Sequence, residues 1–182
     1  YFIAFLNRDA ERMRSALAAA KQKPEAEDWI THAESMVEAY NGHMAEARTL
    51  SRRAVDLAKQ SHQNERAALY VAAAAVRESF LGDAAEGLRL AKEALGLSRN
   101  RDVQFGAAFA QVKCGFTAEA EPLIADLEKR FPEDTYVRFT YVPVLRGLIA
   151  IGQRQPAAAV ALLEPAAPYE LGVPGSWGGF FG

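Results

Sequence analysis

Four glycines divide most of this 182-residue chain at nearly regular intervals. Gly42, Gly82, Gly115 and Gly152 are separated by 40, 33 and 37 residues, and each follows one helix-like run and precedes another that is rich in alanine. Glycine ends helices readily because it adopts the left-handed backbone conformation at little steric cost. A period in the mid-thirties with two helices per unit predicts an all-α array of helical repeats. Because such arrays usually serve as binding surfaces, we expect a protein that binds and does not catalyse.

The clearest unit covers residues 101–134, a length of 34 residues. Its pattern predicts a first helix over 102–114, which Gly115 ends. Thr117 is a suitable N-cap for a second helix, because its hydroxyl oxygen can accept a hydrogen bond from a free N–H of the first turn. This second helix is expected to end before Pro132, which cannot continue it.

This unit resembles a tetratricopeptide repeat. That family has a small residue at the eighth place, glycine near the fifteenth, alanine at the twentieth and proline at the thirty-second, and those places here hold Ala108, Gly115, Ala120 and Pro132. The resemblance covers roughly residues 1–165. It implies a right-handed α-solenoid of about four or five tandem antiparallel helix pairs over residues 1–168. We expect Ala108 and Ala120 to face each other, because small residues are needed where two helices cross closely.

The two preceding units fit the same frame. Residues 7–9 look like one more turn between helices, and Asp83 is a suitable N-cap for the helix after Gly82. The small residues at the two crossing places are Ser35 and Ala47 around Gly42, and Ala75 and Gly87 around Gly82.

The last unit departs from this pattern. A first helix is expected over 135–151, yet Leu145 occupies the place where a small residue belongs when the count is made from Gly152. Pro143 is expected to kink this helix or to mark its early turns. A second helix over 156–164 begins with proline, as helices often do.

The remaining residues, 169–182, form a glycine-rich tail with three large aromatic side chains, those of Trp177, Phe180 and Phe181. We interpret the tail as the truncated start of a further repeat. The alternative is a docking peptide, because proteins seldom leave such side chains exposed without a role.

The resemblance also implies where a ligand binds, because in such arrays the first helix of each pair lines the concave side. Residues at the second, fifth, ninth and twelfth places of each unit point into that groove. The candidate peptide-groove residues are Trp29, His32, Met36, Leu69, Val76, Phe105, Phe109, Phe139 and Arg146. They do not reproduce the basic clamp with which the chaperone-binding branch holds a terminal carboxylate. The groove is therefore expected to bind an apolar or aromatic segment, unless the phenylalanines belong to the core.

Composition argues against several other classes of protein. A net charge of −2, from 21 basic and 23 acidic residues, gives no support to nucleic-acid binding. No apolar run approaches the roughly 18 residues of a membrane span. The single cysteine, Cys114, has no partner for an internal disulfide, which fits a reducing compartment and so the cytoplasm.

No catalytic or cofactor-binding pattern stands out. The three histidines, His32, His43 and His62, lack the spacing that places two metal ligands on one helix face. No phosphate-binding loop is found, and the carboxylates are scattered over helix faces. We therefore expect neither a cofactor nor a metal.

The expected partner is a protein, a peptide or another domain of a longer parent chain. The stretches 130–146 and 169–172 also look like repeat arrays at the C-terminal ends of large bacterial regulators, either serine/threonine kinase-like or winged-helix proteins. That likeness implies a sensor or scaffold fragment of a signalling protein. Two alternatives stay open. One is a module that self-associates through its repeat ends, and the other is an enzyme with a site between helices.

Overall fold

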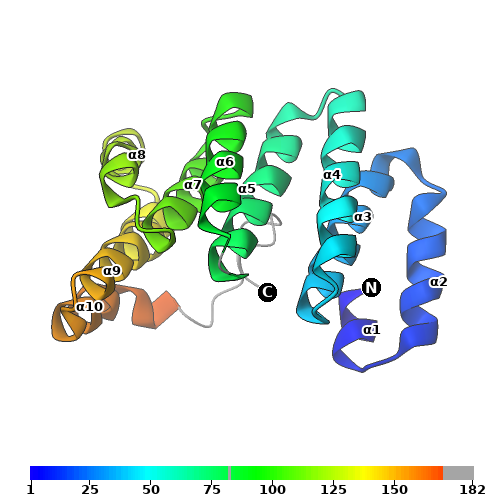
Figure 1. The fold of residues 1–182 in the computed structure, drawn as a ribbon, viewed down its shortest axis with the longest axis horizontal. Helices are drawn as coiled ribbons and strands as arrows, with labels where there is room; N and C mark the ends of the chain where they lie inside the picture. The colour runs from blue at the N-terminus through cyan, green and yellow to red at the C-terminus, as the bar shows by residue number, and fades with distance from the viewer. Residues whose placement is uncertain (82, 170–182) are drawn as a thin grey trace. The chain divides into compact units, whose positions relative to one another are not determined.

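The computed structural model describes residues 1–81 and 83–169, and every regular element in them is helical (Figure 1). These ranges contain ten α-helices, one π-helix and one 3-10 helix, with no strand. The prediction of an all-α protein is confirmed. Within the same ranges, no helix is long and apolar enough to cross a membrane.

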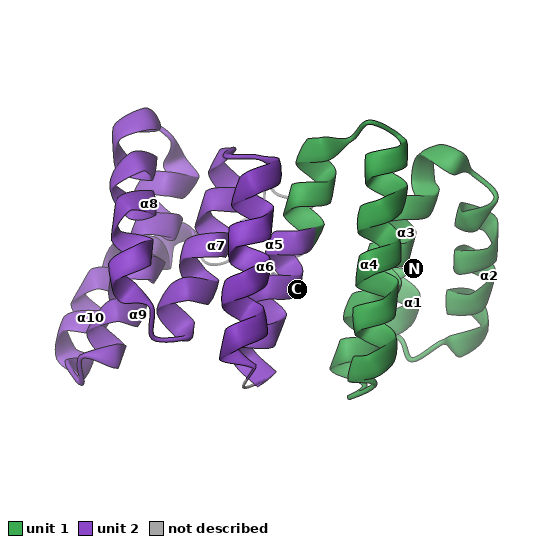
Figure 2. Ribbon diagram, turned by 45° about the horizontal axis from the view of Figure 1, so that its top comes forward, with its two compact units in different colours: residues 1–70 green, residues 71–182 purple. Residues whose placement is uncertain are grey.

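Contacts divide the chain into two compact units, Tyr1–Tyr70 and Val71–Gly182 (Figure 2). In the first unit, helices that follow one another along the chain pack together: α1 with α2, α2 with α3, and α3 with α4. The elements of this unit are α1 (Phe2–Leu6), α2 (Ala10–Lys21), α3 (Pro24–Tyr40), α4 (Met44–Gln60) and the first part of α5 (Asn64–Leu81).

The second unit contains the rest of α5 and all later elements. Helix α7 packs against α6, α8 and α9, and α9 packs against α10. The elements are α6 (Ala84–Leu97), α7 (Arg101–Lys113), α8 (Thr117–Arg130), the π-helix η1 (Val137–Tyr141), α9 (Val142–Gly152), α10 (Pro156–Leu163) and the 3-10 helix η2 (Glu164–Tyr169).

Side chains cap the N-termini of several helices by accepting a hydrogen bond from a backbone amide of the first turn. The carboxylate of Asp83 accepts a hydrogen bond from the amide of Glu86 at 3.0 Å, so this predicted N-cap is confirmed. The prediction for Thr117 is wrong. Thr117 is the first residue of α8, and the preceding Phe116 is the N-cap residue without a side-chain hydrogen bond.

One hydrogen-bonded turn recurs at five helix ends among the residues that the structure describes. In each turn a residue with positive φ follows the helix, and the next residue donates its N–H to a carbonyl five residues earlier, at 2.8 or 2.9 Å. This is the Schellman motif, which satisfies carbonyls that the helix end leaves free. The next helix begins two residues after the positive-φ residue each time. The five residues are Arg8, Gly42, His62, Gly115 and Arg154.

This turn shows that the last pair has a different register from the one predicted. Gly152 is the last residue of α9, and Arg154 adopts the positive φ of 61°. When the count is made from Arg154, the two small places fall on Gly147 and Ala159, both of which are buried. Counted in this way, the two places hold small buried residues as in the other units, while Leu145 is a core residue with no exposed surface. The predicted turn at Gly82 lies outside the described residues.

The small residues predicted in the other units are all buried as well. At Gly87 the close approach can be measured. An added Cβ would lie 3.1 Å from the Cys114 sulfur and 3.4 Å from the Ala75 carbonyl oxygen. Even the smallest side chain would thus meet both neighbours of α6, which is the physical reason for glycine at this place.

Pro143 explains the irregular start of the last pair. It lies in the first turn of α9, directly after the π-helix Val137–Tyr141. A proline inside an α-helix removes one backbone hydrogen bond, and its ring clashes with the carbonyl four residues earlier. The π-helix therefore lies where the ring of Pro143 disfavours regular α-helical winding. The single helix expected over 135–151 is therefore two elements of different winding.

Candidate functional site

Phe105, a candidate groove residue, belongs to the core of the second unit. Its side chain is only 2% exposed and lies in the main hydrophobic cluster. Its ring stacks on that of Tyr141, with centroids 4.1 Å apart and an interplanar angle of 13°. Of the two roles that the sequence left open for Phe105, the structure places it in the core.

An exposed apolar surface lies beside this core, on α5 and α7. Phe80 is 61% exposed, and its ring centroid is 5.8 Å from that of the half-buried Phe109. The ammonium of Lys113 lies 5.3 Å from the centroid of the Phe80 ring. Val76, one turn before Phe80, is half-buried against the core. We call these four residues the α5–α7 surface.

Phe80 is a residue that sequence reasoning missed. It is not at one of the four groove places, but it lies four residues after Val76, and residues four apart share one face of a helix. That spacing is the signal that could have found it. Phe109 and Val76, by contrast, were predicted, and the structure brings them to the same surface as Phe80.

The candidate residues of the first unit lie in different environments. Trp29 is 42% exposed, whereas His32 is buried and its ring stacks on Tyr70 with centroids 4.3 Å apart. Met36 and Leu69 are half-buried. Trp29 is therefore the most exposed member of this group.

Phe139 and Arg146 are engaged within the second unit. The ring of Phe139 stacks on Tyr169, with centroids 5.0 Å apart. The guanidinium of Arg146 lies 2.6 Å from Glu121 and 3.7 Å from Glu128. When the count is made from Arg154, the four groove places of this unit fall instead on Tyr141, Val144, Leu148 and Ile151.

A polar cluster joins α7 to the start of the last pair. The hydroxyl of Tyr141 donates to the Asp102 carboxylate at 2.7 Å, and Arg101 donates to Asp102 at 2.8 Å and to Asp134 at 2.7 Å. Burial and the neighbouring Asp102 raise the pKa of Tyr141 well above its usual range. The hydroxyl is thus a permanent donor that fixes η1 to α7.

The first unit contains a matching cluster. Here Tyr70 donates to Asp28 at 3.2 Å, and Arg66 donates to the other oxygen of the same carboxylate at 3.0 Å. Tyr70 stacks on His32 as Tyr141 stacks on Phe105, and both stacked partners are at the fifth place of their unit. Two tyrosine–aspartate–arginine clusters therefore connect helices that are distant in sequence, which is a structural role.

Acid should weaken the cluster at Asp134. Burial disfavours the carboxylate, but hydrogen bonds from the Val137 amide and from Arg101 outweigh it, so the pKa of Asp134 is lowered. A lowered folded-state pKa gives stability that is present above the unfolded value of about 3.9 and is lost as pH falls through the folded value. We expect Asp134→Asn to cost about 1 kcal/mol at pH 7 and to flatten the fall of unfolding free energy below pH 4.

Urea unfolding at a series of pH values measures this effect. Thr135→Ala is the matched control, because it changes an exposed neighbour without removing a titrating group. An unchanged acid dependence in Asp134→Asn would show that Asp134 does not contribute to acid sensitivity.

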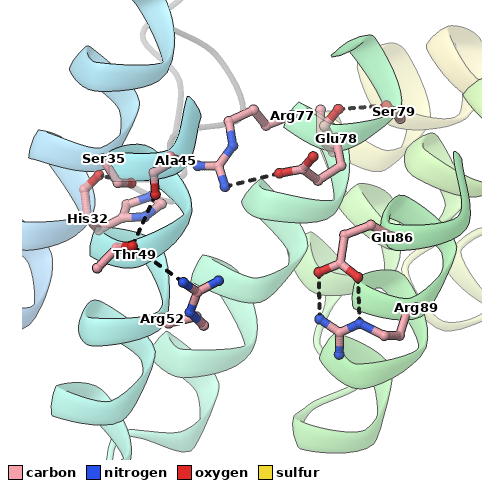
Figure 3. Close-up of polar contacts among 11 residues, drawn as sticks. His32, Ser35, Ala45, Thr49, Arg52, Arg77, Glu78, Ser79, Glu86 and Arg89 are labelled. Carbon is pink, nitrogen blue, oxygen red and sulfur yellow. Dashed lines mark hydrogen bonds and ion pairs between the residues drawn. The ribbon is translucent and has the colours of Figure 1, made fainter. Parts of the chain in front are cut away.

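Several other charged groups form ion pairs. Figure 3 shows Arg77 beside Glu78, where a guanidinium nitrogen lies 3.5 Å from a carboxylate oxygen. In the same figure, two guanidinium nitrogens of Arg89 donate to the two carboxylate oxygens of Glu86, at 2.7 and 2.8 Å. Glu78 is fully buried, so its carboxylate and the Arg77 guanidinium form a structural pair.

Burial raises the pKa of the Cys114 thiol, which fits a packing role. Across the ranges that the structure describes, no group of three or more His, Cys, Asp and Glu residues could hold a metal ion.

Comparisons with protein-family models, with curated proteins and with solved structures found no match to this chain.

Proposed function

We propose that this chain is a protein-interaction module without catalytic activity, built as a right-handed α-solenoid of tandem antiparallel helix pairs of the tetratricopeptide type. The repeated Schellman turn and the buried small residues at the two crossing places support this architecture. The module would be a sensor or scaffold part of a larger cytoplasmic regulator, as in the bacterial arrays that its sequence resembles.

The α5–α7 surface is the proposed binding site. The observation that carries the proposal is the exposed Phe80 ring in contact with Phe109. Exposed aromatic side chains that already pack on one neighbour lose little conformational entropy when a ligand covers them, which favours them as binding anchors. The expected ligand is a segment of a partner protein with apolar or aromatic anchors. Three of the four residues of this surface are uncharged, and Lys113 is the single charged one. Binding should therefore depend little on salt.

Selection of displayed random peptides on the purified chain tests this proposal. We expect the selected peptides to share apolar or aromatic residues. Phe80→Ser should weaken their binding by about 30-fold or more, as for a binding hot spot. Tyr40→Ser is the control, because Tyr40 is an exposed aromatic residue of the first unit outside this surface. Peptides that bind Phe80→Ser as tightly as the unchanged chain would contradict the proposal.

A self-associating module is the second candidate. It is favoured by α1, where Phe2, Ile3 and Leu6 are exposed apolar side chains on a single short helix. Light scattering of the purified chain at increasing concentration would reveal such association. Serine at Ile3 and Leu6 should then abolish it.

A further inference from the structure

Helix α10 has an apolar surface that the described residues leave uncovered. Its eight residues, Pro156–Leu163, include no polar side chain, and Ala159 is the one buried residue among them. Val160 is 65% exposed, and Leu162 and Leu163 are more than one-third exposed. A helix that is apolar on all sides is normally buried, so this helix lacks a cover over part of its surface.

The contacts of α10 show which side is already covered. It packs against α9 and η2. Leu163 lies over Gly147, where an added Cβ would come within 3.3 Å of the leucine side chain. Val160 and Leu162, together with exposed alanines beside them, remain on the open side. We call Val160 and Leu162 the α10 face.

The chain leaves the described part of the structure close to this face. Helix η2 packs on α9, α10 and η1, and its last residue, Tyr169, stacks on Phe139. Residues 170–182 follow directly. They carry one charged side chain, Glu170, and five large apolar ones, those of Leu171, Val173, Trp177, Phe180 and Phe181. A segment with five large apolar side chains and a single charged one at its start matches an uncharged apolar face.

The lengths also fit. Thirteen residues can reach about 43 Å when extended, whereas eight helical residues span about 12 Å. A short tether raises the effective concentration of a linked segment into the millimolar range, so even weak apolar contacts are sufficient for binding.

We propose that residues 170–182 bind the α10 face of the same chain, with Trp177 or a neighbouring phenylalanine covering Val160 and Leu162. The segment would then cover exposed apolar side chains of α10. This inference concerns a different surface from the α5–α7 surface and does not depend on the proposed function.

Trp177 can report on this contact directly. The chain has two tryptophans, so Trp29→Phe leaves Trp177 as the single emitting residue. We expect its emission to be blue-shifted, and less quenched by acrylamide, than that of the free peptide 170–182. Adding Val160→Ser and Leu162→Ser should shift the emission to that of the free peptide, whereas adding Ile3→Ser and Leu6→Ser on α1 should leave it unchanged.

Three results would overturn the proposal. The first is free-peptide emission in the Trp29→Phe chain. The second is a red shift caused by Phe80→Ser but not by the α10 substitutions, which would place the segment elsewhere. The third is loss of the blue shift on dilution, which would mean that the segment binds a second copy.

Hydrogen exchange provides a second measurement if the α10 substitutions unfold the helix. We expect a chain that ends at Tyr169 to exchange its α10 amides faster than the full chain, with α4 unchanged. Equal exchange of α10 in the two chains would contradict the proposal.

Discussion

Phe105→Ser is expected to lower the free energy of unfolding by about 3–5 kcal/mol, the range for truncating a buried phenylalanine. Phe105 is almost fully buried and stacks on Tyr141, so serine would leave a cavity and place a hydroxyl in the core. Because a whole domain is stable by only about 5–15 kcal/mol, this single change should bring the second unit close to unfolding. Urea unfolding followed by circular dichroism measures the loss.

Phe80→Ser is the matched control for stability, since Phe80 carries the same side chain on the same unit but is mostly exposed. Its cost should stay within about 0.5 kcal/mol, as for most surface substitutions. Equal destabilisation by the two serines would mean that Phe80 is also a core residue. The α5–α7 surface would then lose its main anchor.

Leu145→Ala is expected to cost about 2–5 kcal/mol, as for other fully buried leucines. The result distinguishes the two ways of assigning places in the last unit, by counting from Gly152 or from Arg154. Counted from Gly152, Leu145 stands at a crossing place that suits a small residue, and alanine should be tolerated there. Counted from Arg154, Leu145 faces the core and Gly147 takes the crossing place, so alanine at position 145 should leave a cavity.

Gly147→Leu provides the reciprocal test. An added Cβ at Gly147 would already approach Leu163 to 3.3 Å, so a leucine side chain should overpack the contact by about 1–3 kcal/mol. For Leu145→Ala, the control is Leu81→Ala, which makes the same change at an exposed leucine of the same unit. A neutral Leu145→Ala together with a tolerated Gly147→Leu would show that the Gly152 frame is correct.

Both tyrosine–aspartate–arginine clusters escaped prediction. Asp28 and Tyr70 are 42 residues apart, and Asp102 and Tyr141 are 39 apart, so no local pattern links them. The sequence did contain the residue types, but many tyrosines and aspartates would have served equally well. Only the packing of helices that are distant in sequence selects these partners and buries them, which makes their hydrogen bonds strong.

The sequence by itself determined the helices and most of their turns. Glycine at 42 and 115 adopts positive φ, and proline or a capping aspartate marks helix starts, because these effects depend on a few neighbouring atoms. The tertiary structure decided the register of the last pair, where Arg154 takes a conformation that favours glycine. It also decided that Phe105 is buried while Phe80 is exposed, because burial depends on helices that are distant in sequence and meet only when the chain folds.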